Sequence, residues 1–287
     1  MRQLTVPAAE HARHWPHPAF PDTDLLHARY VDYAFGRHRH QQYTFGVVTE
    51  GLEDFHCRGE LYHAGRGTVS MVDADTVHTG QAGSSGGWRY QVLYADVDLV
   101  GSVAHDLGGR GLPSFPDPLV TDTQAATTLL RAHEAAAAGD RLAASEHTLR
   151  AVRLLVRRYA RVAAVGAVDG DAGSRVVAES AAVLRARLVD PPSVDELARM
   201  AGCSPFALIR AFRRHVGLPP HAYLTQCRVD RARALLVGGS DVASTALAVG
   251  FADQAHLTRH FRRHVGVPPA RFARERRNVQ ETGSRRA

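Results

Sequence analysis

The stretch Phe212–Tyr223, FRRHVGLPPHAY, recurs further along the chain as Phe261–Phe272, FRRHVGVPPARF. Each copy closes a similar run of residues, Ser193–Gly217 in the first case and Asp241–Gly266 in the second. A repeat of this kind indicates that one supersecondary unit is used twice.

Helix start and stop signals identify the repeated unit. In the first copy, Ser193 and Glu196 have the spacing of a capping box, and Gly202 suits the end of a helix. Ser204 then suits the cap of a second helix. The second copy repeats these signals with Asp241, Gly250 and Asp253. Two short helices joined by a glycine-containing turn form a helix-turn-helix, although one isolated copy would equally fit an ordinary helical hairpin.

Apolar spacing predicts which side of each helix faces inward. In the first copy we expect Val194, Leu197, Ala198 and Met200 to point into the core, followed by Leu208 and Phe212. In the second copy the corresponding expectation concerns Leu247, Val249, Leu257 and Phe261.

The charge of the chain is unevenly distributed. All 35 basic residues are arginines, against 29 acidic residues. Residues 174–287 hold 19 arginines and 9 acidic residues, whereas residues 1–173 hold 16 and 20. Because duplex affinity comes largely from neutralising phosphates, this asymmetry predicts that the second half of the chain binds double-stranded DNA.

The second helix of each unit supplies the candidate DNA contacts. The exposed face of the later helix predicts base contacts from Gln254, His256, Thr258 and Arg259. The earlier helix offers Phe206, Ile209 and Arg210 for the same role. We expect phosphate contacts from Ser204, Arg213, Arg214, Arg262 and Arg263.

The pattern G-F-x-D-Q-x-x-L-x-R-x-F-R-R-x-x-G-x-P-P-x-x-F over Gly250–Phe272 resembles the AraC/XylS family of bacterial transcription regulators. The resemblance covers roughly Val176–Arg277. It implies two helix-turn-helix subdomains bridged by a long helix, here about His221–Val237, which would be about 25 Å long. That length suits two recognition helices in successive major grooves, about 34 Å apart along the duplex.

The first half of the chain has a different pattern. Between Val31 and Val97, short alternating segments are separated by glycine-containing turns, which favours an antiparallel sandwich or small barrel. His38-Arg-His40, Gly51, Gly67 and His78 resemble the cupin-like effector domain of the same family, over about Leu25–Leu99.

In catalytic cupins, an H-x-H pair and a later histidine join a carboxylate to hold a metal. Tyr43 and Thr44 stand where that carboxylate is expected, so we expect no metal and no cofactor. Contact with an effector and a structural role are the remaining interpretations of these histidines. Inward aromatic and polar residues of the barrel predict an effector site formed by His38, His40, Tyr43, Phe45, His56, Arg58, His78, Trp88 and Tyr90. Packing in an ordinary core is the alternative for the aromatic residues.

Two helical runs follow, Thr121–Ala138 and Asp140–Arg161, separated by Gly139. Six residues of the second run follow the three-four spacing of a helix-pairing seam: Leu142, Ser145, Leu149, Val152, Val156 and Tyr159. The family resemblance implies a homodimer through this helix, and packing against its own barrel is the competing explanation.

The sequence therefore predicts an α+β protein. Its parts are an N-terminal arm over 1–24, a cupin-like effector-binding barrel over 25–120, a helical dimerisation segment over 121–162, a linker over 163–174, an AraC-type DNA-binding domain over 175–277 with helix-turn-helix units at 193–217 and 241–266, and a tail over 278–287.

We expect a cytoplasmic, sequence-specific regulator that binds a small-molecule effector, has no enzymatic activity and does not bind membranes. Family habit favours an activator, which would also contact RNA polymerase. Two alternatives remain open: a metal-dependent cupin enzyme with a DNA-binding appendage, and an architectural DNA binder without a ligand.

Overall fold

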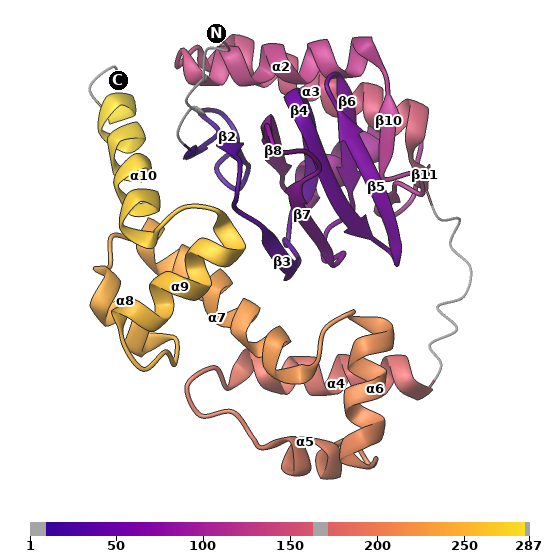
Figure 1. Ribbon diagram of the computed structural model, residues 1–287, viewed down its shortest axis with the longest axis vertical. Helices are drawn as coiled ribbons and strands as arrows, with labels where there is room; N and C mark the ends of the chain where they lie inside the picture. Colours follow the sequence, from indigo (N-terminus) through magenta and orange to yellow (C-terminus); the bar gives the residue numbers. More distant parts are fainter. Residues whose placement is uncertain (1–9, 163–171, 285–287) are drawn as a thin grey trace, which may run out of the picture. The chain divides into compact units, whose positions relative to one another are not determined.

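The computed structural model describes residues 10–162 and 172–284, which form two compact units. The sheet and helices α1–α3, together called the sheet domain below, make up the first unit apart from Arg37–Arg39. Helices α4–α10 belong to the second unit (Figure 1). Most of the predicted linker, residues 163–174, lies outside the described residues. Its last three residues begin helix α4 (Ala172–Ala186).

The first unit is built on a nine-stranded antiparallel sheet, as the sequence predicted. Its main order is β1-β2-β8-β4-β6-β10. Strands β5 and β7 also pair with β4, and β3 pairs with β7. The strands are β1 (His11–Pro16), β2 (Asp24–Tyr30), β3 (Phe35–His38), β4 (Tyr43–Cys57), β5 (Glu60–Gly65), β6 (Thr68–Val72), β7 (His78–Ala82), β8 (Trp88–Ala95) and β10 (Leu119–Thr121). Two short strands, β9 (Pro113–Ser114) and β11 (Arg161–Val162), pair separately.

Strand β4 organises this sheet because it pairs with four others. Its first half pairs with β6 and β8, and its second half pairs with β5 and β7. The register against β8 shifts between Val48 and Glu50, so one extra residue is inserted there. Side chains alternate between the two faces of a strand, and such a bulge therefore exchanges the faces for every residue beyond it.

The N-terminal arm predicted over residues 1–24 is only partly an arm. Strand β1 pairs antiparallel with β2 from His11 opposite Arg29 to Pro16 opposite Asp24. Strand β1 is therefore part of the sheet and not a separate arm, and residues 1–9 lie outside the described part of the chain. The histidine- and proline-rich composition of this segment gave no sign of a strand, although Ala12, His14 and Trp15 in β1 are buried.

Helices α2 (Thr123–Ala137) and α3 (Arg141–Tyr159) pack together against one face of the sheet (Figure 1). Helix α1 (Val97–Asp106) packs beside α3. Asp122 and Asp140 cap α2 and α3 by accepting backbone N–H groups. The residues of the predicted seam on α3 lie in two different environments. Val152 and Val156 are buried against the sheet, whereas Leu142 is 79% exposed and Leu149 is 41% exposed.

The second unit confirms the repeated helix-turn-helix. Ser193 and Glu196 form the predicted capping box, and Ser204, Asp241 and Asp253 cap the helices that follow them. The helices are α5 (Val194–Met200), α6 (Pro205–His215), α7 (Pro220–Val237), α8 (Val242–Ala248), α9 (Gln254–Val265) and α10 (Pro269–Ser284). Helix α7 is the predicted bridge.

Buried residues hold each helix pair in place. Leu197, Ala198, Leu208 and Phe212 pack against α4 and α7, and Leu257 and Phe261 are fully buried in the second copy. Three expected core residues are instead exposed: Val194 (36%), Met200 (61%) and Leu247 (62%). Helices α5 and α8 have 7 residues each, about two turns, so only the middle of each reaches the core. None of the described helices is long and apolar enough to cross a membrane.

Candidate DNA interface and candidate effector site

Helix α9 presents a polar face opposite its buried one. Gln254 and Arg259 are exposed, while Leu257 and Phe261 are buried. The carboxylate of Asp253 accepts the backbone N–H of His256 at 2.7 Å and fixes the first turn. Amide and guanidinium groups can each bond bidentately to a base edge, so this face can read DNA sequence.

His256 and Thr258 lie at the edge of that face and are half-buried. The Thr258 hydroxyl donates to the backbone carbonyl of Gln254 at 2.8 Å, which leaves its methyl group and lone pairs for a base. The His256 ring stands edge-on to Phe251, with ring centroids 5.1 Å apart. These two side chains are held more firmly than Gln254 or Arg259.

Helix α6 offers fewer polar groups. Arg210 is exposed, Ile209 is half-buried, and the side chain of Phe206 lies outside the described residues. Ser204 accepts the backbone N–H of Ala207 at 3.2 Å, so its hydroxyl caps the helix and still has a hydrogen to donate.

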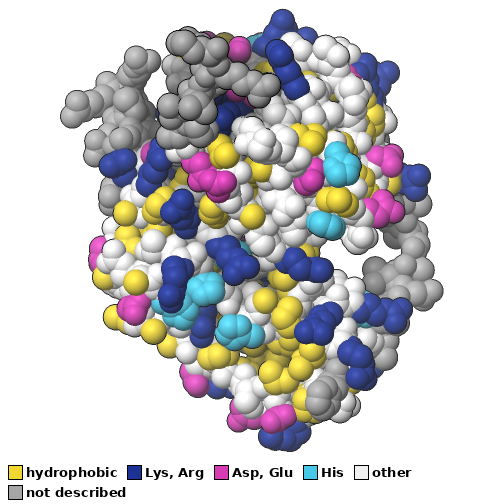
Figure 2. All heavy atoms as spheres, viewed as in Figure 1, with side chains coloured by type: hydrophobic (Ala, Val, Ile, Leu, Met, Phe, Trp, Pro, Cys, Tyr) yellow, Lys and Arg dark blue, Asp and Glu magenta, His cyan; other side chains and the backbone are white. Residues whose placement is uncertain are grey.

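The four arginines expected to contact phosphate lie in the last turns of α6 and α9, and all are exposed: Arg213, Arg214, Arg262 and Arg263. Figure 2 shows arginine and histidine side chains next to one another in the region of α9. Cations at a helix C-terminus also interact favourably with the helix dipole. The same four arginines can therefore stabilise their helices and bind phosphates.

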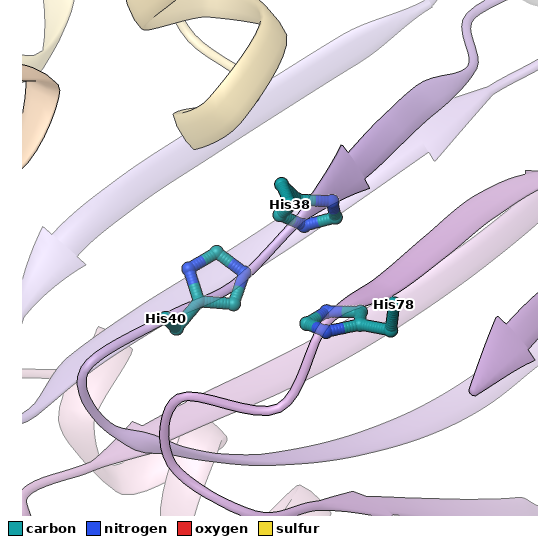
Figure 3. Close-up of side chains that lie close together, drawn as sticks. All are labelled: His38, His40 and His78. Carbon is teal, nitrogen blue, oxygen red and sulfur yellow. The ribbon is translucent and has the colours of Figure 1, made fainter. Parts of the chain in front are cut away.

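Within the sheet domain, three predicted residues come together. His38 ends β3, His40 follows it and His78 begins β7, and one ring nitrogen of each lies within 4.8 Å of the others. Figure 3 shows the three rings converging. The His78 Nδ1 atom lies 3.0 Å from the Thr76 carbonyl, and burial lowers the pKa of His78. No fourth histidine, cysteine or carboxylate among the described residues joins this histidine cluster.

Trp88 and Tyr90 belong to a second group, called here the aromatic cluster. Their ring centroids are 5.8 Å apart, and each lies near Tyr30, at 5.3 Å and 6.2 Å. Tyr33 and Phe35 complete the cluster: Tyr33 stacks on Tyr30 at 4.9 Å, and Phe35 stands edge-on to both tyrosines. All but the half-buried Tyr33 are buried.

Four predicted effector residues face elsewhere. Tyr43 and Phe45 lie in the core between the sheet and its helices, where the Tyr43 hydroxyl donates to Pro113. His56 and Arg58 are exposed, and Arg58 donates to the Phe115 and Pro116 carbonyls at the edge of the sheet. The prediction that these side chains face the interior is therefore wrong. The bulge in β4 explains both errors. Even-numbered residues face the interior before the bulge and odd-numbered residues face it afterwards, so Tyr43 and Phe45 point to the helices and His56 and Arg58 point to solvent.

Sequence reasoning also missed residues that the fold brings inside. Glu53 shares a face of β4 with the buried Phe55 and Cys57, and it is only 7% exposed. That alternation is visible in the sequence and could have located Glu53. Tyr30, Tyr33 and Phe35 carried no comparable signal, since only the turn from β2 into β3 places them against Trp88 and Tyr90.

Residues 20–152 match the family described as AraC-like ligand binding domain, and residues 197–275 match one described as helix-turn-helix domain. The chain is 23% identical over 226 residues to YbfI of Bacillus subtilis, an uncharacterized HTH-type transcriptional regulator, covering 78% of this chain and 81% of YbfI. It is 33% identical over 75 residues to the transcriptional regulator MtrA of Neisseria gonorrhoeae, covering 24% of this chain and 25% of MtrA.

Among solved structures, ToxT from Vibrio cholerae O395 superposes with a TM-score of 0.52 at 12% identity, covering 93% of this chain and 97% of ToxT. ToxT from strain SCE256 with a bound unsaturated fatty acid gives 0.53 at 13% identity, covering 92% and 94%. At these identities the likeness concerns the fold.

Proposed function

This chain belongs to the AraC/XylS family of transcription regulators, and we propose that it is a dimeric activator that responds to a small-molecule effector. One observation carries the DNA-binding role. Two helix-turn-helix units each end in a helix with exposed arginines, and α9 adds an exposed glutamine. An activator of this kind works in the cytoplasm and contacts RNA polymerase.

The exposed side of α3 is the proposed dimer surface. Leu142 and Leu149 are seven residues apart, on one side of the helix, and both are exposed in a single chain. A second copy of α3 would cover them, because a seven-residue spacing matches helix pairing. This supports the dimer while Val152 and Val156 serve the core of their own chain.

The sheet domain is proposed to bind the effector without catalysing a reaction. To act on transcription, the effector must bind two states of the protein with different affinity, since equal affinity shifts no equilibrium. Linkage then requires that operator DNA change effector affinity by the same factor. Isothermal titration of the effector with and without operator measures this coupling, and equal affinities would rule it out.

The DNA-binding role is tested by selecting duplexes from a random library with the full chain. We expect one enriched motif, and we expect the double variant Arg210→Ala with Arg259→Ala to lose the enrichment. Arg131→Ala, at an exposed arginine of α2, is the matched control and should enrich the same motif. Selection of unrelated sequences by the wild-type chain would contradict sequence-specific binding.

The histidine cluster favours a second candidate, a metal-dependent enzyme. Three buried imidazoles can hold a transition metal and leave a position open for a substrate. Elemental analysis of the protein purified without added metal distinguishes the two functions. One metal ion per chain, lost in the His38→Ala variant, would support the enzyme, and an absence of stoichiometric metal would count against it.

A further inference from the structure

We propose that the inside of the sheet domain binds an organic cation, with the Glu53 carboxylate next to its charge and the aromatic cluster around it. The proposal rests on the proposed function, because it names the chemical class of the effector. A primary amine or a quaternary ammonium compound fits this description.

Glu53 supplies the first observation. Its side chain is 7% exposed, and no hydrogen bond or ion pair joins it to another described residue. The charged group that acts on it is the Asp54 carboxylate, which has the same sign. A buried carboxylate without a partner is costly, since buried charges are normally paired. A cation brought in from solution would provide the missing partner.

The aromatic cluster supplies the second observation, and it lies next to Glu53. The Phe35 ring and the Glu53 Oε1 atom approach the same point beside Gly80, and Tyr90 interacts electrostatically with Glu53. Aromatic rings beside a carboxylate favour a cation, because the face of each ring is electronegative. The same set disfavours an anionic effector, which the carboxylate would repel.

Trp88 adds a buried hydrogen-bond donor that a ligand could use. Its ring is fully buried, and its Nε1–H group has no hydrogen-bond partner. Trp88 lies opposite Gly51 on β4, two residues before Glu53 and on the same face. A hydroxyl or carbonyl group on the cation could accept this hydrogen, so a cation bearing such a group should bind better than one without it.

The probes are choline and tetramethylammonium, compared with 3,3-dimethyl-1-butanol, the uncharged carbon analogue of choline. Binding to the full chain is measured by calorimetry, and by Trp88 fluorescence in a Trp15→Phe variant, which removes the other tryptophan. We expect saturable binding of both cations, with choline tighter. The uncharged analogue should bind at least about tenfold more weakly, since a desolvated cation–π contact is worth that much.

Variants assign the site. Glu53→Gln keeps the shape and removes the charge, so choline affinity should fall at least about tenfold. Glu50→Gln is the matched control, because Glu50 lies on the same strand but is exposed and pairs with Arg89. A second pair tests the rings without touching the carboxylate: Tyr90→Leu should weaken binding, and Tyr90→Phe should not. A thermal scan of each variant verifies that its sheet domain is folded.

The pH dependence reports on Glu53, because a quaternary ammonium carries a fixed charge. Burial raises the pKa of Glu53 to about 8. Asp54 acts on Glu53, and Tyr30, Tyr33 and Tyr94 act on Tyr90, while burial holds the pKa of Tyr90 well above 10. Choline affinity should therefore rise by up to about tenfold per pH unit between pH 6 and 8. Glu53→Gln should abolish this rise.

Three outcomes would overturn the proposal: no binding of either cation, equal binding of the uncharged analogue, or full affinity in Glu53→Gln. None of these affects the DNA selection, so a wild-type chain that still enriches one motif would retain the proposed function with an effector of another class.

Discussion

The Oε1 atom of Glu53 occupies the space in which a side chain on Gly80 would begin. A Cβ atom built on Gly80 would lie 2.9 Å from that oxygen and 3.5 Å from the Phe35 ring. The carboxylate can therefore lie this close to β7 only because residue 80 is a glycine.

Gly80→Ala should displace the carboxylate without unfolding the protein. The obstructing atom is the end of a flexible side chain, and Gly80 is not among the glycines with a positive φ angle. We expect choline affinity to fall about tenfold if the ion pair is lengthened or lost. Calorimetry measures the affinity, and a thermal scan should show a melting temperature close to that of the wild type. Undiminished affinity would show that the position of Oε1 is unimportant.

Glu53→Gln should stabilise the protein at alkaline pH. The pKa of Glu53 rises from 4.5 to about 8 on folding, so between these values the native state holds a proton that the unfolded state has lost. Stability from this group therefore falls as the pH rises through that window. The variant should gain more unfolding free energy at pH 8 than at pH 5, as measured by denaturant titration. Glu50→Gln should show no such trend.

His133→Gln should protect the protein against acid. The His133 Nε2 atom lies 2.9 Å from the Val92 carbonyl, and burial lowers the pKa of this histidine to about 3. The unfolded chain binds a proton near pH 6.5 and the native state does not, so wild-type stability falls as the pH drops below 6.5. The slope from one such group is about 1.4 kcal/mol per pH unit.

Glutamine can donate to the same carbonyl and does not titrate in this range. Denaturant titrations at pH 7, 6 and 5 should therefore show a flatter profile in His133→Gln. His56→Gln, at an exposed histidine, is the control. An identical slope in wild type and His133→Gln would mean that His133 does not govern acid sensitivity.

Arg259 and Arg263 should differ in what they recognise, although both are exposed on α9. Arg259→Ala should lose about 1–3 kcal/mol of discrimination at one base pair of the selected motif. Arg263→Ala should weaken binding to all duplexes and lower the slope of log affinity against log salt by about one. Equilibrium binding at several salt concentrations, to motif and scrambled duplexes, separates the effects. Identical behaviour of the two variants would reject the assignment.

Leu149→Glu should produce a monomer if α3 forms the dimer. The substitution places a charge on the proposed surface, while Val152 and Val156 keep the helix on its own sheet. Sedimentation should show the wild type at twice the mass of the variant. Leu61→Glu introduces the same change at an exposed leucine of β5 and should leave the mass unchanged. A wild-type monomer, or a dimeric Leu149→Glu variant, would contradict the proposed surface.

The helical half of this protein could be predicted closely because its signals are local. Ser193, Ser204, Asp241 and Asp253 each cap a helix within three residues of themselves, so helix starts depend little on distant contacts. The repeat then identified the unit. The errors concerned Val194, Met200 and Leu247, whose exposure depends on where α5 and α8 meet the core.

For the sheet domain, the sequence predicted less, and the tertiary structure decided more. By itself the sequence determined that short alternating segments would pair, and that His38, His40 and His78 belonged together. Only the tertiary structure decided which residues face inward. One extra residue between Val48 and Glu50 reverses the faces of β4, so that Phe45 lies under the helices while Glu53 lies inside, near rings from β3 and β8. Alternation along a strand is a local property of the sequence. Which of the two alternating sets of residues faces inward is decided by pairing with strands distant in the chain.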